Sequence, residues 1–564
     1  MRLLLPAALA LLAACDDDPV RQDPSPDVQV QDEGPRADVG PDEGVPPDEG
    51  VVADAAVDAH VPPPILDAPL AWVYANDPTT DEGELTQVAL DRVTDPEGRL
   101  TSPSVQVFNC LNEEGGLTAM PDLGGFTIEV SLCHEVQTVR PDADGNYLSV
   151  RPPEDGSDPN DPFAEVMMYH HVNHVHDYFK GTHGFDDLDF PLPAIVNLQF
   201  KINPPLPLPG FMPGPDGWYA FPNAAFFPKE SWNELAASFG LPGRDSDSII
   251  FGQAGHDFAY DARVIYHEYT HAVVGTSRLQ VPAAVDRYGL DGSSRAMNEG
   301  LADYFAGTLA DGPAIGVFGI GELAPDQVRD MTDARRCPDD LFDEVHADGR
   351  IIGSTLWAVR QAIGAEITDR IVFRALEQFT EGTTHQIAAE LILAEAEEEG
   401  AEIHGQVLEI FGNFGFIDCE RSIPWARFRV EGSRDGLPHR VEGRNTVGIP
   451  GFGRGVPAYK QQHVDVPAGT LGVTLSWQPQ AGSAGFIPGA GGAPQALDLL
   501  IRRGETIEVQ PGREAAYVAD ERFTAELTGA TQHLTLDASC LPADGGRLYT
   551  LFINPGNDPV NLLA

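Results

Sequence analysis

The feature that most constrains the fold is the apolar run at residues 264–274, which contains His267, Glu268 and His271. Residues four positions apart lie on one face of an α-helix, so the two histidines can direct their imidazole nitrogens at one point. Two histidines and an adjacent glutamate at this spacing are typical of a zinc site that keeps one coordination position for water. The alternative, two surface histidines beside an unrelated glutamate, leaves the apolar neighbours unexplained. We therefore expect a buried helix that carries two metal ligands.

A catalytic zinc site needs a third protein ligand. Glu299 is the candidate, because it lies in a second helical run, 28 residues after His271 (299 − 271). Asp303 follows one turn later on the same face, and we expect it to accept a hydrogen bond from a ligand histidine.

Beyond these motifs, the chain resembles the thermolysin-like and fungalysin-like zinc metallopeptidases, the gluzincins. Residues 221–226 resemble the edge strand that lines the peptide-binding cleft of that family, which implies that Asn223 and Ala224 bind the substrate main chain. Residues 328–333 resemble the family segment whose arginine binds a substrate carbonyl, which implies this role for Arg329. Residues 344–349 resemble the segment whose histidine stabilises the oxyanion, which implies that role for His346.

The resemblance covers about residues 160–420 and implies a central α+β domain with two lobes, the C-terminal lobe being mainly helical. It further implies one catalytic zinc ion and a metalloendopeptidase that cleaves extracellular proteins or peptides. In that mechanism Glu268 activates the water that zinc holds, and zinc and His346 stabilise the oxyanion. Two alternatives stay open: a non-catalytic surface module on a degenerate peptidase fold, and a zinc aminopeptidase.

Three features depart from the family pattern or compete with it. Tyr288 is a candidate for the oxyanion-stabilising tyrosine by position only. The acidity is compatible with structural Ca²⁺, but no motif supports a calcium site, and Arg263 lies one turn before His267. His170 and His174 are four positions apart and offer a second metal site, although a packed first helix is the favoured interpretation.

The N-terminus predicts export. Residues 1–15 have the pattern of a short apolar signal peptide that ends in a lipobox-like sequence, so we expect acylation of Cys15. The acylated cysteine is expected to anchor the protein in the bacterial cell envelope, at the outer membrane or cell surface, with release from the cell as the alternative. Residues 16–64 carry fourteen acidic side chains and ten prolines, which predicts an extended, disordered tether.

The two regions that flank the helical part show alternating β patterns. Residues 66–150 predict a small β-rich N-terminal region, and residues 421–564 a C-terminal β-sandwich. An exported chain favours disulfides. Cys110 and Cys133 form the natural local pair, whereas two of Cys337, Cys419 and Cys540 are expected to pair without the sequence deciding which.

The net charge of −52 excludes direct binding of nucleic acid, because such a field repels the phosphate backbone. The expected partners are protein or peptide substrates and, through the anchor, a membrane. No feature determines the oligomeric state, and a monomer is favoured.

Overall fold

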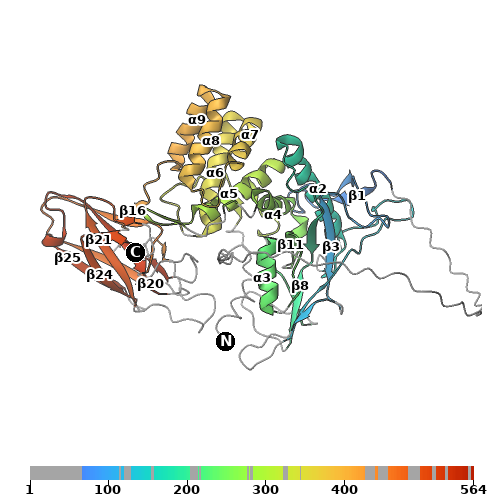
Figure 1. Cartoon of the computed structure of the whole chain (residues 1–564), viewed down its shortest axis with the longest axis horizontal. Coiled ribbons are helices and arrows are strands. Elements are labelled where there is room, and N and C mark those ends of the chain that lie inside the picture. Colours follow the sequence, from blue (N-terminus) through green and yellow to red (C-terminus); the bar gives the residue numbers. More distant parts are fainter. Residues whose placement is uncertain are drawn as a thin grey trace, which may run out of the picture.

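The computed structural model describes residues 66–563 apart from short gaps, the longest of which are 120–128, 204–213, 426–437, 442–454 and 480–495. Cys15 and the predicted signal peptide and tether lie outside the described residues. The described chain is a multidomain mixed α/β structure, as predicted, in which helices α6–α9 lie between an N-terminal region rich in strands and a C-terminal β region (Figure 1). Among the described helices, none combines the length and the hydropathy that a membrane span requires.

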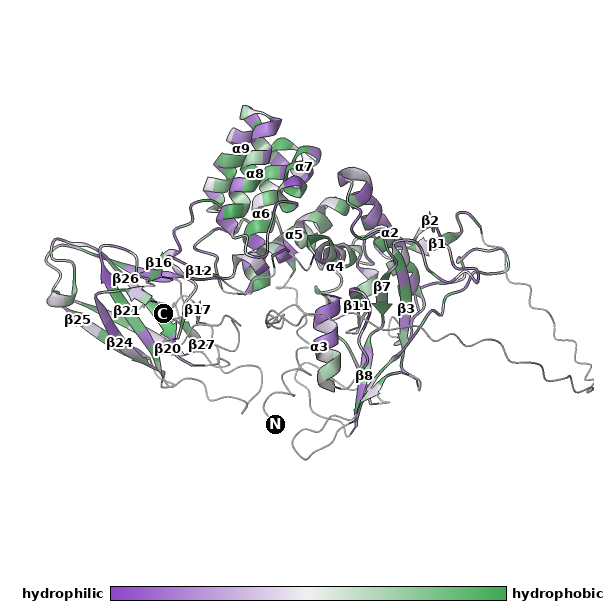
Figure 2. Ribbon diagram, in the orientation of Figure 1, coloured by the Kyte–Doolittle hydropathy of each residue, from purple (hydrophilic) through white to green (hydrophobic). Residues whose placement is uncertain are grey.

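A five-stranded sheet of order β10-β11-β7-β3-β6 forms the centre of the N-terminal region. Its strands are β3 (Val105–Leu111), β6 (His134–Val136), β7 (Leu192–Val196), β10 (Ala224–Phe227) and β11 (Ser248–Phe251). The three inner strands are parallel, and β10 is antiparallel at one edge. Figure 2 shows β3 and β7 as largely apolar, as expected for strands covered on both faces.

Different helices cover the two faces of this sheet. Side chains of β3, β7 and β11 share one core with α2 (Phe163–His183) and α4 (Ala262–Val274). On the opposite face Ile195 and Ile250 pack with Trp232 of α3 (Lys229–Phe239). The N-terminal region is completed by β1 (Leu70–Val73), β2 (Thr86–Ala89), β4 (Thr118–Ala119), β5 (Glu129–Leu132), β8 (Gln199–Asn203) and β9 (Trp218–Ala220).

The boundary predicted between residues 66–150 and 160–420 does not separate two folded units. Strand β3 pairs in parallel with β7, and β5 pairs with β8, so strands from both segments share sheets and a core. Alternation along the sequence reveals each strand, but the partner of a strand depends on contacts between distant residues, which periodicity does not encode.

The helical region places two helices in close contact. They are α5 (Ser293–Leu309) and α6 (Val345–Ile363), and glycines allow their approach: a Cβ atom at Gly349 would lie 2.9 Å from the Cβ of Glu299. Helices α7 (Ala365–Leu376), α8 (His385–Glu399) and α9 (Ala401–Phe414) pack behind α6. Short strands β12 (Ala284–Asp286), β13 (Gly289–Asp291), β14 (Ala314–Ile315) and β15 (Arg329–Asp330) connect the helices.

The C-terminal region contains a six-stranded and a four-stranded sheet whose apolar side chains form one core. Its strands are β16 (Ser422–Pro424), β17 (Pro438–Val441), β18 (Val456–Pro457), β19 (Gln461–Val466), β20 (Gly472–Pro479), β21 (Ala496–Arg503), β22 (Glu508–Gln510), β23 (Ala516–Val518), β24 (Glu521–Glu526), β25 (Gln532–Asp537), β26 (Gly546–Asn554) and β27 (Val560–Leu563).

Two disulfides cross-link the described chain. Cys110 bonds to Cys133, the local pair that the sequence favoured, and Cys337 bonds to Cys419. Cys540 carries a free thiol. The second bond joins the segment before α6 to the start of the C-terminal β region.

Candidate metal centre and active site

Helix α4 carries both histidines of the motif on one buried face. The helix begins after Asp261, whose carboxylate accepts hydrogen bonds from the backbone N–H groups of Arg263 and Val264. His267 and His271 are 4% and 8% exposed, and their Nε2 atoms face each other at 3.1 Å. Two imidazole nitrogens at this separation are placed to bind the same metal ion.

Glu299 on α5 brings a carboxylate to the same point. Its Oε2 atom lies 3.3 Å from His267 Nε2, and its Oε1 atom lies 3.8 Å from His271 Nε2. Metal–ligand bonds of about 2.0–2.1 Å in a tetrahedral site place ligand atoms roughly 3.3 Å apart. The buried Oε2 atom has no hydrogen-bond partner. Among the described residues, these three form a group that could hold a metal ion, and their donor set fits zinc.

The electrostatics of this centre also favour a cation. Burial acts to raise the pKa of Glu299, but the nearby imidazoles of His346, His271 and His267 outweigh it and hold the pKa well below its usual range. Burial acts to lower the pKa of His267, but the adjacent carboxylates of Asp303 and Glu299 outweigh it and raise the pKa to about 9. Excess negative charge around buried imidazoles is the environment that a divalent cation neutralises.

Both histidines of the motif are oriented by a second contact. His267 Nδ1 lies 2.9 Å from Asp303 Oδ1, and Asp303 also binds the Arg329 guanidinium through two hydrogen bonds of 2.7 and 2.8 Å. His271 Nδ1 lies 2.9 Å from the side-chain oxygen of Asn298. Such partners fix the ring orientation of metal ligands. Asn298 is not among the residues that the sequence predicts for the site, although it immediately precedes Glu299.

Glu268 lies beside the two histidines and is in contact with the edge strand. Its side chain is 3% exposed, and its Oε2 atom accepts a 2.8 Å hydrogen bond from the backbone N–H of Phe226 on β10. Asn223 and Ala224 are located at the start of that strand, which is an edge of the five-stranded sheet. The predicted base and the predicted peptide-binding strand are thus joined by a direct bond.

His346 belongs to the first turn of α6 and extends toward Glu299. Its Nε2 atom lies 3.5 Å from Glu299 Oε2, and its Nδ1 atom lies 2.8 Å from Glu344 Oε1. Glu344 also accepts hydrogen bonds from the backbone N–H groups of His346 and Ala347 at the helix N-terminus. Burial acts to raise the pKa of Glu344, but these bonds to His346 outweigh it and lower the pKa to about 2. Glu344 orients the imidazole and is not among the residues that the sequence predicts for the site.

Two further candidates make contacts with other parts of the protein. Tyr288, in the β12–β13 turn, accepts a hydrogen bond from Arg287 and contacts Arg421 of the C-terminal region. The rings of His170 and His174 stack on α2 with centroids 6.4 Å apart, and they do not form part of a described metal-binding group.

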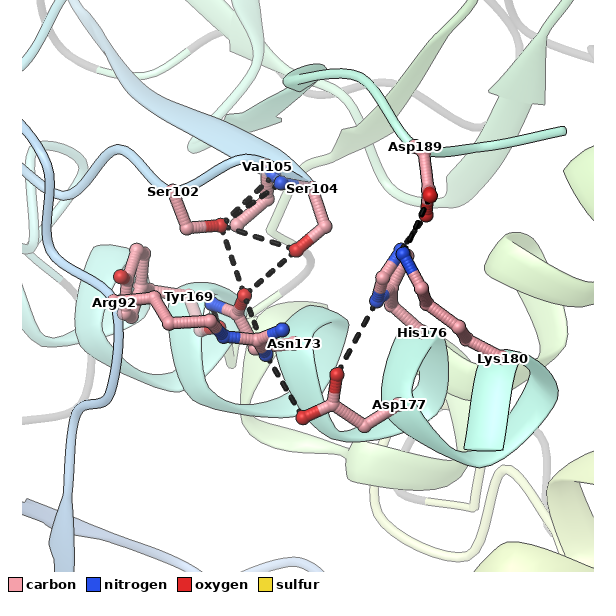
Figure 3. A network of polar contacts seen from close by, with 10 residues as sticks. All are labelled: Arg92, Ser102, Ser104, Val105, Tyr169, Asn173, His176, Asp177, Lys180 and Asp189. Atoms are coloured by element: carbon pink, nitrogen blue, oxygen red, sulfur yellow. Dashed lines mark hydrogen bonds and ion pairs between the residues drawn. The ribbon is translucent and has the colours of Figure 1, made fainter. Parts of the chain in front are cut away.

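The remaining histidines of α2 are bound by protein groups. Figure 3 shows His176 between Asp177 and Asp189, at 3.3 and 2.9 Å, one carboxylate at each ring nitrogen. The same view shows Asn173 fixing α2 through the hydroxyls of Ser102 and Ser104. The histidine-rich stretch is therefore a packed and hydrogen-bonded helix.

No protein-family model matches the chain, and no curated protein does. Among solved structures, the precursor of protealysin, a metalloproteinase from Serratia proteamaculans, is similar over 56% of this chain and 89% of its own, with a TM-score of 0.33 and 14% sequence identity.

Proposed function

We propose that this chain is a zinc metalloendopeptidase. The observation that carries the proposal is the convergence of His267, His271 and Glu299 beside the Glu268 carboxylate, in a buried site next to a sheet edge. When bound by these three residues, zinc would act as a Lewis acid on water and on the scissile carbonyl.

The proton transfers fall to Glu268. Its carboxylate removes a proton from the attacking water and passes it to the leaving amine, as a general base and then a general acid. The Phe226 N–H holds the carboxylate in one orientation at the sheet edge, where an extended peptide can pair with β10. We assign Asn223 and the Ala224 backbone to the binding of the substrate main chain.

His346 stabilises the developing oxyanion. Its Nε2 atom is directed toward the proposed metal ligand Glu299. Its imidazole is 30% exposed, so a substrate can reach it, and Glu344 fixes its other nitrogen. A donor placed in advance at such a position typically contributes about 10²–10³-fold to kcat. We assign Arg329, held by Asp303, to a substrate carbonyl.

The test compares Glu268→Gln with the exposed control Glu397→Gln on α8. Both proteins are loaded with zinc and assayed for cleavage of casein and of an internally quenched peptide blocked at both ends. We expect Glu268→Gln to retain zinc and lose activity, whereas the control retains both. Cleavage by Glu268→Gln at the control rate would refute the role of Glu268.

The same assay separates the alternatives. Cleavage of the blocked peptide excludes an aminopeptidase, which requires a free amino terminus. Absence of any cleavage by zinc-loaded protein would favour a non-catalytic binding module.

We also propose that the enzyme is exported and anchored through Cys15. The two disulfides support an oxidising compartment. Expression with a radiolabelled fatty acid tests the anchor, and label that persists in a Cys15→Ser variant would contradict it.

A further inference from the structure

Besides α4, two helices carry candidate active-site residues: α5 carries Glu299 and α6 carries His346. The C-terminal β region contacts the start of each of these two helices. These contacts come from residues 458–461, here called the brace segment, which precede and enter β19. The brace segment is buried: Tyr459 and Lys460 are each 5% exposed, and Ala458 and Gln461 are fully buried.

One set of contacts is with the residues around the start of α6. The Lys460 ammonium donates a hydrogen bond to the Leu341 carbonyl, and the Tyr459 hydroxyl donates one to the Asp348 carboxylate. Asp348 is fully buried, and its Oδ1 atom accepts a 2.6 Å hydrogen bond from the Phe342 N–H. Asp348 lies in the first turn of α6, two residues after His346. The brace segment therefore fixes the chain on both sides of the imidazole.

A second set of contacts is with the hairpin that leads into α5. The Ala458 carbonyl accepts a hydrogen bond from the Leu290 N–H, and the Gln461 side chain donates one to the Tyr288 carbonyl. A Cβ atom at Gly292, the residue before α5, would lie 2.7 Å from the Tyr459 hydroxyl oxygen. Tyr459 thus packs against the start of the helix that carries Glu299.

The two sets of contacts are part of one core. Leu290, Leu341 and Ile351 pack in the same apolar cluster as the strands of the C-terminal region. A buried ammonium and a buried carboxylate are costly to leave without partners, so these contacts have to stay formed in the folded chain.

We propose that the brace segment positions His346 relative to Glu299, so that the C-terminal β region is required for catalysis. This inference rests on the proposed peptidase function. Tyr459 and Lys460 are positioning residues: they touch no reacting atom and act through the first turn of α6.

The variants that test this are Tyr459→Phe and Lys460→Met in the full-length, zinc-loaded protein. The matched control is Tyr517→Phe, in the same C-terminal region. It removes a hydroxyl that donates a hydrogen bond to the Gly455 carbonyl. We expect both test variants to lower kcat about tenfold with KM changed less than twofold, because part of the oxyanion stabilisation is lost. The control should match the parent.

A double-mutant cycle distinguishes positioning from a general loss of structure. If Tyr459 acts through His346, Tyr459→Phe should have no further effect on kcat in a His346→Ala background. An equal loss in both backgrounds would overturn the inference.

Hydrogen exchange gives a readout that does not need activity. Amides in residues 341–350 should exchange about tenfold faster in Tyr459→Phe than in Tyr517→Phe, because a hydrogen bond to a buried charge is lost. Exchange equal to that of the control would overturn the inference, even in a protein without peptidase activity. Absence of chelator-sensitive cleavage by the parent would instead refute the proposed function.

Discussion

Replacing Asp303 with Asn tests how far the metal site depends on residues outside the ligand set. The carboxylate is 2% exposed, lies 2.9 Å from His267 Nδ1 and binds Arg329 through two hydrogen bonds. Asparagine keeps the shape and one acceptor oxygen but removes the charge that both neighbours share. Loss of such a partner typically weakens metal binding about 10–100-fold, or roughly 1.4–2.7 kcal/mol.

The same change should also destabilise the metal-free protein. Removing one partner of a buried ion pair costs about 3–5 kcal/mol, and because the Arg329 side chain keeps 12% exposure we expect about 3 kcal/mol. The assays are zinc affinity by competition with a chromogenic chelator and urea unfolding in EDTA.

A control variant separates the two effects. Asp369→Asn alters a buried carboxylate that accepts hydrogen bonds from Tyr304 and Tyr178 and has no contact with a metal ligand. It should lower stability and leave zinc affinity unchanged. If Asp303→Asn binds zinc as tightly as the parent, or if both variants lose affinity equally, the role of Asp303 is refuted.

Three further predictions concern orientation, packing and pH. Glu344→Gln removes the charge beside His346 Nδ1, so kcat should fall about tenfold with little change in KM, and an unchanged kcat would exclude the orienting role. Gly349→Ala places a methyl group 2.9 Å from the Glu299 Cβ, so overpacking should lower the free energy of unfolding by about 1–3 kcal/mol and reduce activity. A variant as stable and active as the parent would show that α5 and α6 can move apart at no cost. Burial raises the pKa of Glu165 to about 7, so the stability that it contributes below its unfolded pKa is lost as pH rises through 7. Glu165→Gln lacks this loss, so its unfolding free energy should rise by about 3 kcal/mol relative to that of the parent between pH 4.5 and pH 8. If the difference in unfolding free energy between the two proteins stays constant over this range, the raised pKa of Glu165 is contradicted.

The sequence predicted the parts of the site that have a local pattern. The i, i+4 spacing of His267 and His271 requires a helix to bring them together, and Glu299 and Asp303 share the same spacing on the next helix. The structure brings His267, His271 and Glu299 together around one point and places Asp303 at the Nδ1 atom of His267. The segment that contains His346 was found through its resemblance to a family, not through periodicity.

The remaining contacts could not be predicted because they join residues far apart in the chain. The bond from the Phe226 N–H to Glu268 depends on how β10 lies against α4, and the bond from Tyr459 to Asp348 spans 111 positions (459 − 348). The membership of β3 in the central sheet was missed for the same reason. Each depends on tertiary packing, for which a single sequence gives no pattern.

The most direct test of the central claim is a zinc titration of chelator-stripped protein with peptide cleavage as the readout. If His267, His271 and Glu299 form the catalytic centre, cleavage should be absent without metal, rise in proportion to added zinc and saturate at one zinc ion per chain. Cleavage that is independent of zinc, or no cleavage at one bound zinc ion per chain, would contradict the proposed metalloendopeptidase.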